Sequence, residues 1–118
     1  MEFTSGGTEG FKLNKKLYDI PEELNMYGTI EGINSKLELV SKFHQLGWSV
    51  RKSSWTDYEV ENEWTELCIQ GENEILLSGI LDEQKFEELG DLLNSFGVKY
   101  NFELVDEFQI LKRTISNK

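Results

Sequence analysis

Two segments of the sequence carry the signals that begin and end a short amphipathic helix. Ser35 is followed three residues later by Glu38, which is the spacing of a capping box, and Gly47 is the residue type that ends such a helix. Asp82 is a good N-cap for the second segment, and Gly97 ends it. Between these ends, apolar residues recur at helical spacing: Leu39, Val40, Phe43 and Leu46 in the first segment, and Phe86, Leu89, Leu92, Leu93 and Phe96 in the second. Each predicted helix therefore has one apolar stripe, which needs one surface to pack against.

The segments around the predicted helices show the alternation of apolar and polar residues that is typical of strands. The alternation is clearest in residues 98–105, and a longer extended segment over residues 55–70 changes phase at a turn or bulge near residues 61–63. Other strands are expected at residues 26–33, 48–54, 75–80 and 108–115. The predicted order of elements is β-α-β-β-β-α-β-β.

Two helices with one stripe each would cover one face of a mainly antiparallel sheet, which is an α+β fold. The arrangement is similar to a ferredoxin-like sandwich with extra strands, a likeness of fold that implies no function. At 118 residues the chain has room for one domain, expected at residues 26–118. Residues 1–25 are expected to form a weakly patterned leader that is partly disordered or draped on the core. The sequence has no run of 18 apolar residues and no signal peptide, so a cytoplasmic protein is expected.

The negative charge is concentrated in one part of the chain. The net charge is −10 at pH 7, and residues 53–84 contain nine acidic residues without a single lysine or arginine. A surface of this sign repels phosphates, so the sequence argues against direct binding of nucleic acid. It favours a basic protein as the partner, because charge of opposite sign speeds encounter.

Aromatic residues are interleaved with part of this acidic window. The four acids at alternate positions would project from one face of an extended strand, about 7 Å apart. Such a ridge with aromatic anchors suits capture of a basic protein, although it is also what a merely solvated face would look like. The predicted partner-binding residues are Trp55, Asp57, Tyr58, Glu59, Glu61, Glu63, Trp64 and Glu66.

The residues that usually carry catalysis or bind metals are sparse. His44 is the single histidine and Cys68 the single cysteine, which argues against a structural zinc site and an internal disulfide. An acidic neighbourhood does not activate a thiol, and Cys68 is expected to be structural. Neither a calcium loop nor a phosphate-binding loop is present in the sequence. We therefore expect a protein that is not an enzyme and needs no metal or cofactor.

In size, charge and α+β pattern the chain is similar to many small bacterial immunity proteins, which inhibit a cognate toxin, often a basic nuclease. That resemblance implies an acidic inhibitor of a basic partner. The alternative is a small-molecule-binding regulatory domain of ferredoxin-like type, either a monomer or a dimer formed through its sheet edge or open face, with a ligand near Ser35 or Asp82 at a helix N-terminus or subunit interface. The sequence leaves open whether the protein is a monomer or a homodimer.

Overall fold

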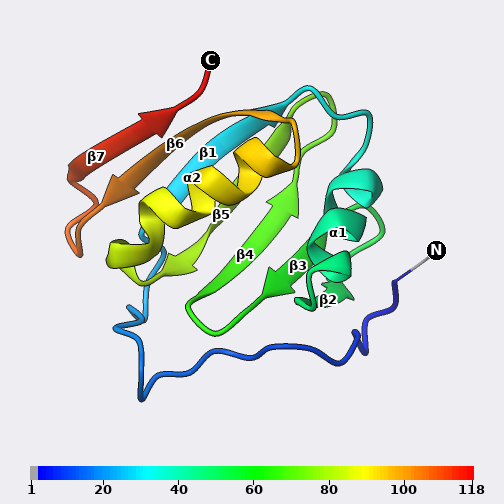
Figure 1. Cartoon of the computed structure of the whole chain (residues 1–118), viewed down its shortest axis with the longest axis horizontal. Coiled ribbons are helices and arrows are strands. Elements are labelled where there is room, and N and C mark those ends of the chain that lie inside the picture. Colours follow the sequence, from blue (N-terminus) through cyan, green and yellow to red (C-terminus); the bar gives the residue numbers. More distant parts are fainter. Residues whose placement is uncertain (1–2) are drawn as a thin grey trace.

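In the computed structural model, which describes residues 3–118, the chain forms one seven-stranded sheet with both α-helices on the same face (Figure 1). The helices are Lys36–Gln45 (α1) and Phe86–Ser95 (α2), and a short 3₁₀ turn, Glu83–Lys85 (η1), precedes α2. The strands are Met26–Glu31 (β1), Ser49–Lys52 (β2), Tyr58–Glu61 (β3), Thr65–Gln70 (β4), Ile75–Leu81 (β5), Lys99–Val105 (β6) and Leu111–Ser116 (β7). The α+β class predicted from the sequence is confirmed.

The predicted order of elements is wrong by one strand. Residues 55–70 form two strands, β3 and β4, where the sequence suggested one interrupted strand. Asn62 explains the difference, because its Oδ1 accepts hydrogen bonds from the backbone amides of Trp64 (2.9 Å) and Thr65 (3.0 Å). The side chain thereby closes a turn near the position where the alternation changes phase. The chain therefore has four strands between its two helices.

The helix ends follow the local signals in the sequence. Ser35 Oγ accepts a hydrogen bond from the amide of Glu38 (3.1 Å), and Gly47 follows α1 with a φ of 89°. Asp82 also caps, but the turn that it opens is η1, where its Oδ1 accepts from the amide of Gln84 (3.0 Å). The second helix then begins at Phe86 without a side-chain cap of its own.

All the strand pairs in the sheet are antiparallel, in the order β2-β3-β4-β5-β1-β6-β7 (Figure 1). The first strand therefore lies near the middle of the sheet, between β5 and β6. The β3–β4 hairpin stands between β2 and β5, and β7 extends the other edge. With these additional strands, the ferredoxin-like order itself is not confirmed.

The core fills the layer between the helices and the sheet. Phe43 of α1 packs against Trp48 and Phe96, with ring centroids 4.7 and 5.1 Å away. The stripe of α2 is buried at Phe86, Leu89 and Leu93. Because both helices lie on this face, the opposite face of the sheet has no helical cover, and we call it the uncovered face. Within residues 3–118, neither helix is long and apolar enough to cross a membrane.

Residues 3–25 form an irregular segment, the N-terminal strap, that follows the border of the sheet (Figure 1). The Phe3 side chain is buried and its ring centroid lies 5.3 Å from that of His44. The amide of Thr8 donates to the carbonyl of Val50 in β2 (2.8 Å), and the amide of Asn14 donates to a carbonyl in the β3–β4 turn (2.8 Å). The strap then leads into β1. Met1 and Glu2 of the predicted leader lie outside the described residues.

Candidate functional site

The predicted ridge of four carboxylates on one strand is only half formed. Because β3 extends only from Tyr58 to Glu61, just two of the four acids, Glu59 and Glu61, belong to the strand and share its uncovered face. Asp57 precedes the strand and its Oδ1 lies 3.3 Å from Nζ of Lys36 on α1. The fourth acid, Glu63, lies in the β3–β4 turn. The expectation of four carboxylates in one row is therefore wrong, and the shortness of β3 is the reason.

A third carboxylate joins Glu59 and Glu61 from the neighbouring strand. In the register of β3 with β4, Glu66 is the direct partner of Glu61, and Cys68 is the partner of Glu59. Directly paired residues in an antiparallel sheet point to the same face. The acidic group on the uncovered face is thus built across two strands, from three of the predicted residues.

The predicted aromatic anchors do not accompany these acids. Tyr58 lies on the helix side of β3, where its ring centroid is 6.4 Å from that of Phe3. Trp64 also packs against the core, with its ring 5.8 Å from that of Trp48. Trp55 is 91% exposed, but it belongs to the loop between β2 and β3. The predicted contact surface is therefore divided among the uncovered face, the core and a loop.

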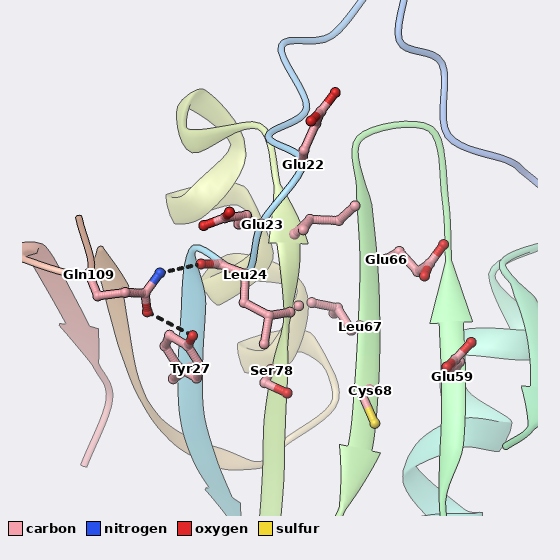
Figure 2. A pocket seen from close by; sticks show the side chains of 12 residues that line it. Glu22, Glu23, Leu24, Tyr27, Glu59, Glu66, Leu67, Cys68, Ser78 and Gln109 are labelled. Atoms are coloured by element: carbon pink, nitrogen blue, oxygen red, sulfur yellow. Dashed lines mark hydrogen bonds between the residues drawn. The ribbon is translucent and has the colours of Figure 1, made fainter. Parts of the chain in front are cut away.

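A hollow of about 640 Å³ opens on the uncovered face beside the acidic group (Figure 2). Its floor comes from β1, β4 and β5, and the end of the N-terminal strap forms one wall. Carboxylates from the strap, from β3 and from β4 surround it, and we call it the acidic hollow. It is lined by Glu22, Glu23, Leu24, Tyr27, Glu59, Glu66, Leu67, Cys68, Ser78, Gly79, Ile80 and Gln109.

The carboxylates of this face differ in how their charge is compensated. Glu59 forms an ion pair with Arg51 of β2. Glu61 Oε2 accepts a hydrogen bond from the amide of Leu13 in the strap (2.7 Å), and its Oε1 lies 4.0 Å from Nζ of Lys12. Both groups are therefore partly neutralised by the protein itself.

Glu22, Glu23 and Glu66 are not compensated in this way. Among residues 3–118, no lysine or arginine forms a salt bridge with any of the three. Burial raises the pKa of the Glu66 carboxyl and the nearby charges of Glu61 and Glu59 raise it further, while the more weakly felt charges of Arg51 and Lys12 offset part of this rise. A cation placed in the acidic hollow would relieve this repulsion.

The single cysteine and the single histidine lie on different elements, Cys68 on β4 and His44 on α1. Burial raises the pKa of the Cys68 thiol, and the charges of Glu59 and Asp57 add to the effect, so its reactive thiolate is disfavoured. His44 belongs to α1 and stands against Phe3, away from the hollow. In the described part of the chain, no group of three histidine, cysteine or acidic side chains is arranged to hold a metal ion.

The two residues near which a small ligand was expected, Ser35 and Asp82, already accept hydrogen bonds from the protein itself. Ser35 accepts its hydrogen bond from the first turn of α1. Asp82 is buried and accepts from the amides of Gln84 (3.0 Å) and of Asp19 in the strap (3.3 Å). These donors leave less of either N-terminus free for an anionic ligand.

Several residues of the acidic hollow escaped the sequence-based prediction. Glu22 and Glu23 follow Pro21 in the strap, and no periodic pattern places them beside the sheet. Tyr27 reaches the hollow because β1 pairs with β5, where its direct partner is Ser78. Gln109 comes from the β6–β7 turn. Only the pairing of distant strands brings these residues together, and local signals do not contain it.

No family model, curated protein or solved structure matches this chain. Its function has to be inferred from the chemistry of the uncovered face. That chemistry is an open, concave surface with carboxylates in excess over cations, an exposed apolar side chain at Leu24 and an aromatic ring at Tyr27. The surface can bind positively charged groups that carry an apolar stem.

Proposed function

We propose that this protein is a non-enzymatic binding module that captures a basic protein partner through the acidic hollow and the uncovered face around it. The observation that carries the proposal is that Glu22, Glu23 and Glu66 line an open hollow and form no salt bridge within residues 3–118. Lysine and arginine side chains of a partner would neutralise these carboxylates, and their methylene stems would pack on Leu24 and Tyr27.

The charge of the whole chain supports the same kind of partner. A net charge of −10 attracts a basic protein over a distance of about 10 Å at moderate ionic strength and accelerates encounter. Once the partner is docked, the hollow provides a defined place for one or two of its cationic side chains. We therefore propose an inhibitor of the immunity-protein type, acting in the cytoplasm, with a basic toxin or nuclease as its partner.

Trp55 remains a candidate for a second contact with the partner. The loop that carries it is held by hydrogen bonds from the amides of Ser53 (3.0 Å) and Ser54 (3.4 Å) to the carbonyl of Asp57, and by the ion pair of Asp57 with Lys36. Lys52 Nζ lies 5.8 Å from the Trp55 ring centroid. A large exposed ring on an ordered loop is the kind of anchor that contributes most to binding energy in protein interfaces.

An affinity experiment with matched charge variants tests the proposal. The baits are the native chain, a triple variant Glu22→Gln, Glu23→Gln, Glu66→Gln, and a control variant Glu72→Gln, Asp91→Asn, Glu107→Gln. The control removes the same charge from exposed positions outside the hollow. We expect a basic protein to be retained by the native and control baits and lost from the triple variant. Its binding should weaken as the salt concentration rises from about 50 to about 300 mM, because salt screens ionic contacts. Equal retention by all three baits would contradict the proposal.

A further inference from the structure

The β6–β7 turn contains a backbone conformation that its residue type does not favour. Gln109 has a φ of 64°, and it is the single non-glycine residue with positive φ among residues 3–118. Glycine adopts this left-handed region at no steric cost, and it is the usual choice at such a position of a hairpin. A glutamine here is strained, so its side chain has to offset the difference.

The turn itself does not need the glutamine side chain. Asp106 Oδ1 accepts hydrogen bonds from the amides of Phe108 (2.8 Å) and Ile110 (3.0 Å). The backbone closes the turn further, with the Asp106 amide donating to the Ile110 carbonyl (2.9 Å) and the Gln109 amide donating to the Asp106 carbonyl (2.9 Å). A glycine at position 109 would preserve all four bonds.

The Gln109 side chain instead reaches the N-terminal strap (Figure 2). Its Nε2 donates to the carbonyl of Leu24 (3.0 Å), and its Oε1 accepts from the hydroxyl of Tyr27 (2.8 Å). One amide thus joins the last turn of the sheet to the strap and to the first strand. Both ends of the amide are used, and they fix its orientation because a carbonyl can only accept.

The strap is tied to the sheet at residue 25, directly after the segment that Gln109 contacts. Asn25 is well tied, because its amide donates to the Gly79 carbonyl (3.1 Å) and its Nδ2 donates to the Leu81 carbonyl (2.8 Å). Residues 22–24 are exposed, and the Gln109 bond is the one hydrogen bond that the described residues make to them. Gln109 is therefore the residue that ties this part of the wall directly to the β6–β7 turn.

We propose that Gln109 is a positioning residue, a clasp that holds residues 22–24 beside the uncovered face and so keeps Glu22 and Glu23 at the acidic hollow. The strain at position 109 is retained because the amide orders this wall before a partner arrives. Such ordering lowers the entropy cost of binding. The clasp stands on the structure alone, whereas its effect on affinity rests on the proposed function.

Backbone order parameters from ¹⁵N relaxation test the clasp without a partner. The variants are Gln109→Met, which keeps the length of the side chain, and Gln109→Gly, which also relieves the backbone. The control is Glu107→Gly, which alters the same turn but makes no bond to the strap. We expect the backbone order parameters of residues 22–24 to fall from about 0.85 to below about 0.6 in both Gln109 variants. In the control they should keep the native value.

The two Gln109 variants distinguish a residue that holds the strap from one that only forms the β6–β7 turn. If Gln109 served only the turn, Gln109→Gly would leave the order of residues 22–24 unchanged, and that result would overturn the proposal. Tyr27→Phe removes one of the two side-chain bonds and should give an intermediate loss of order.

Partner binding gives a second readout, distinct from the test of the proposed function. With the partner retained by the native bait, Gln109→Met should weaken affinity about fivefold, the factor that one ordinary hydrogen bond is worth. Its salt dependence should stay native, because every charge of the hollow is still present. Unchanged affinity in Gln109→Met would refute a role of the clasp in binding. If binding of the partner to the native protein did not change with salt concentration, that result would instead count against the proposed function.

Discussion

Single carboxylates on the uncovered face differ in what surrounds them, and this difference determines their chemistry. Glu59 has a guanidinium partner in Arg51, and Glu61 has a backbone amide. Glu66 has the charges of both these acids as neighbours and forms no salt bridge within the described chain, and the charges of Arg51 and Lys12 offset only part of the repulsion. Its environment therefore opposes ionisation, through burial first and through repulsion second.

Glu66→Gln should stabilise the protein at neutral pH. The pKa of this carboxyl in the folded state lies above its ordinary value of 4.5. Its contribution to stability is therefore fully present below pH 4.5 and is lost as the pH rises through the raised pKa. The variant avoids this loss, so its free energy of unfolding should exceed that of the native protein at pH 7, by less than about 1 kcal/mol because solvent screens the group.

Urea unfolding at pH 7 and pH 4 measures this effect. The difference between the two proteins should shrink at pH 4, and Glu72→Gln, at an exposed position, serves as the control. A Glu66→Gln variant that is less stable than the native protein at pH 7 would show that the carboxylate has a stabilising partner after all.

Among the elements, β1 has a tight packing requirement at Gly28. It lies between β5 and β6, and a Cβ atom on Gly28 would collide with the ring of Phe102 and with the carbonyl of Asn101. Glycine at this position lets a large aromatic side chain of β6 cross the strand. The packing of this central strand against the core therefore depends on the absence of a side chain at Gly28.

Gly28→Ala should destabilise the fold by about 1–3 kcal/mol, the usual cost of overpacking a core. Phe102 is fully buried and the Asn101 contact is backbone, so neither can move away cheaply. Thermal unfolding compares this variant with Gly6→Ala, where the nearest atom to the new Cβ is 3.8 Å away. Equal melting temperatures for the two variants would contradict the packing described for β1.

The limits of prediction from sequence are also clearest at the level of elements. Caps and glycines at Ser35, Gly47 and Gly97 predicted both helices closely, because these signals are local. The turn at Asn62 was visible only as a change of phase, and its division of one strand into two was not predicted. The alternation of residues then predicted that Asp57 and Glu63 belong to the same strand as Glu59 and Glu61, because it assumes an unbroken strand, whereas both lie outside β3.

In the molecule as a whole, two helices cover one face of the sheet and the N-terminal strap follows the border of the sheet (Figure 1). The acidic hollow depends on this arrangement, because its residues come from the strap, three central strands, β3 and the last turn. The sequence indicated an acidic surface around Glu59, Glu61 and Glu66. It could not indicate Glu22, Tyr27 or Gln109, because strand order and the path of the strap bring them there.

The central claim is that the acidic hollow is a binding site for cationic side chains. The most direct measurement is a ¹⁵N–¹H NMR titration of the protein with a short arginine-rich peptide at 100 mM salt, an ionic strength at which charges further apart than about 10 Å are screened. We predict shift changes concentrated at Tyr27, Glu66, Cys68 and Ser78. They should be lost in the triple variant Glu22→Gln, Glu23→Gln, Glu66→Gln and kept in the charge-matched control. Shifts spread evenly over exposed acids such as Glu72 and Asp91, and equal in the two variants, would contradict the account.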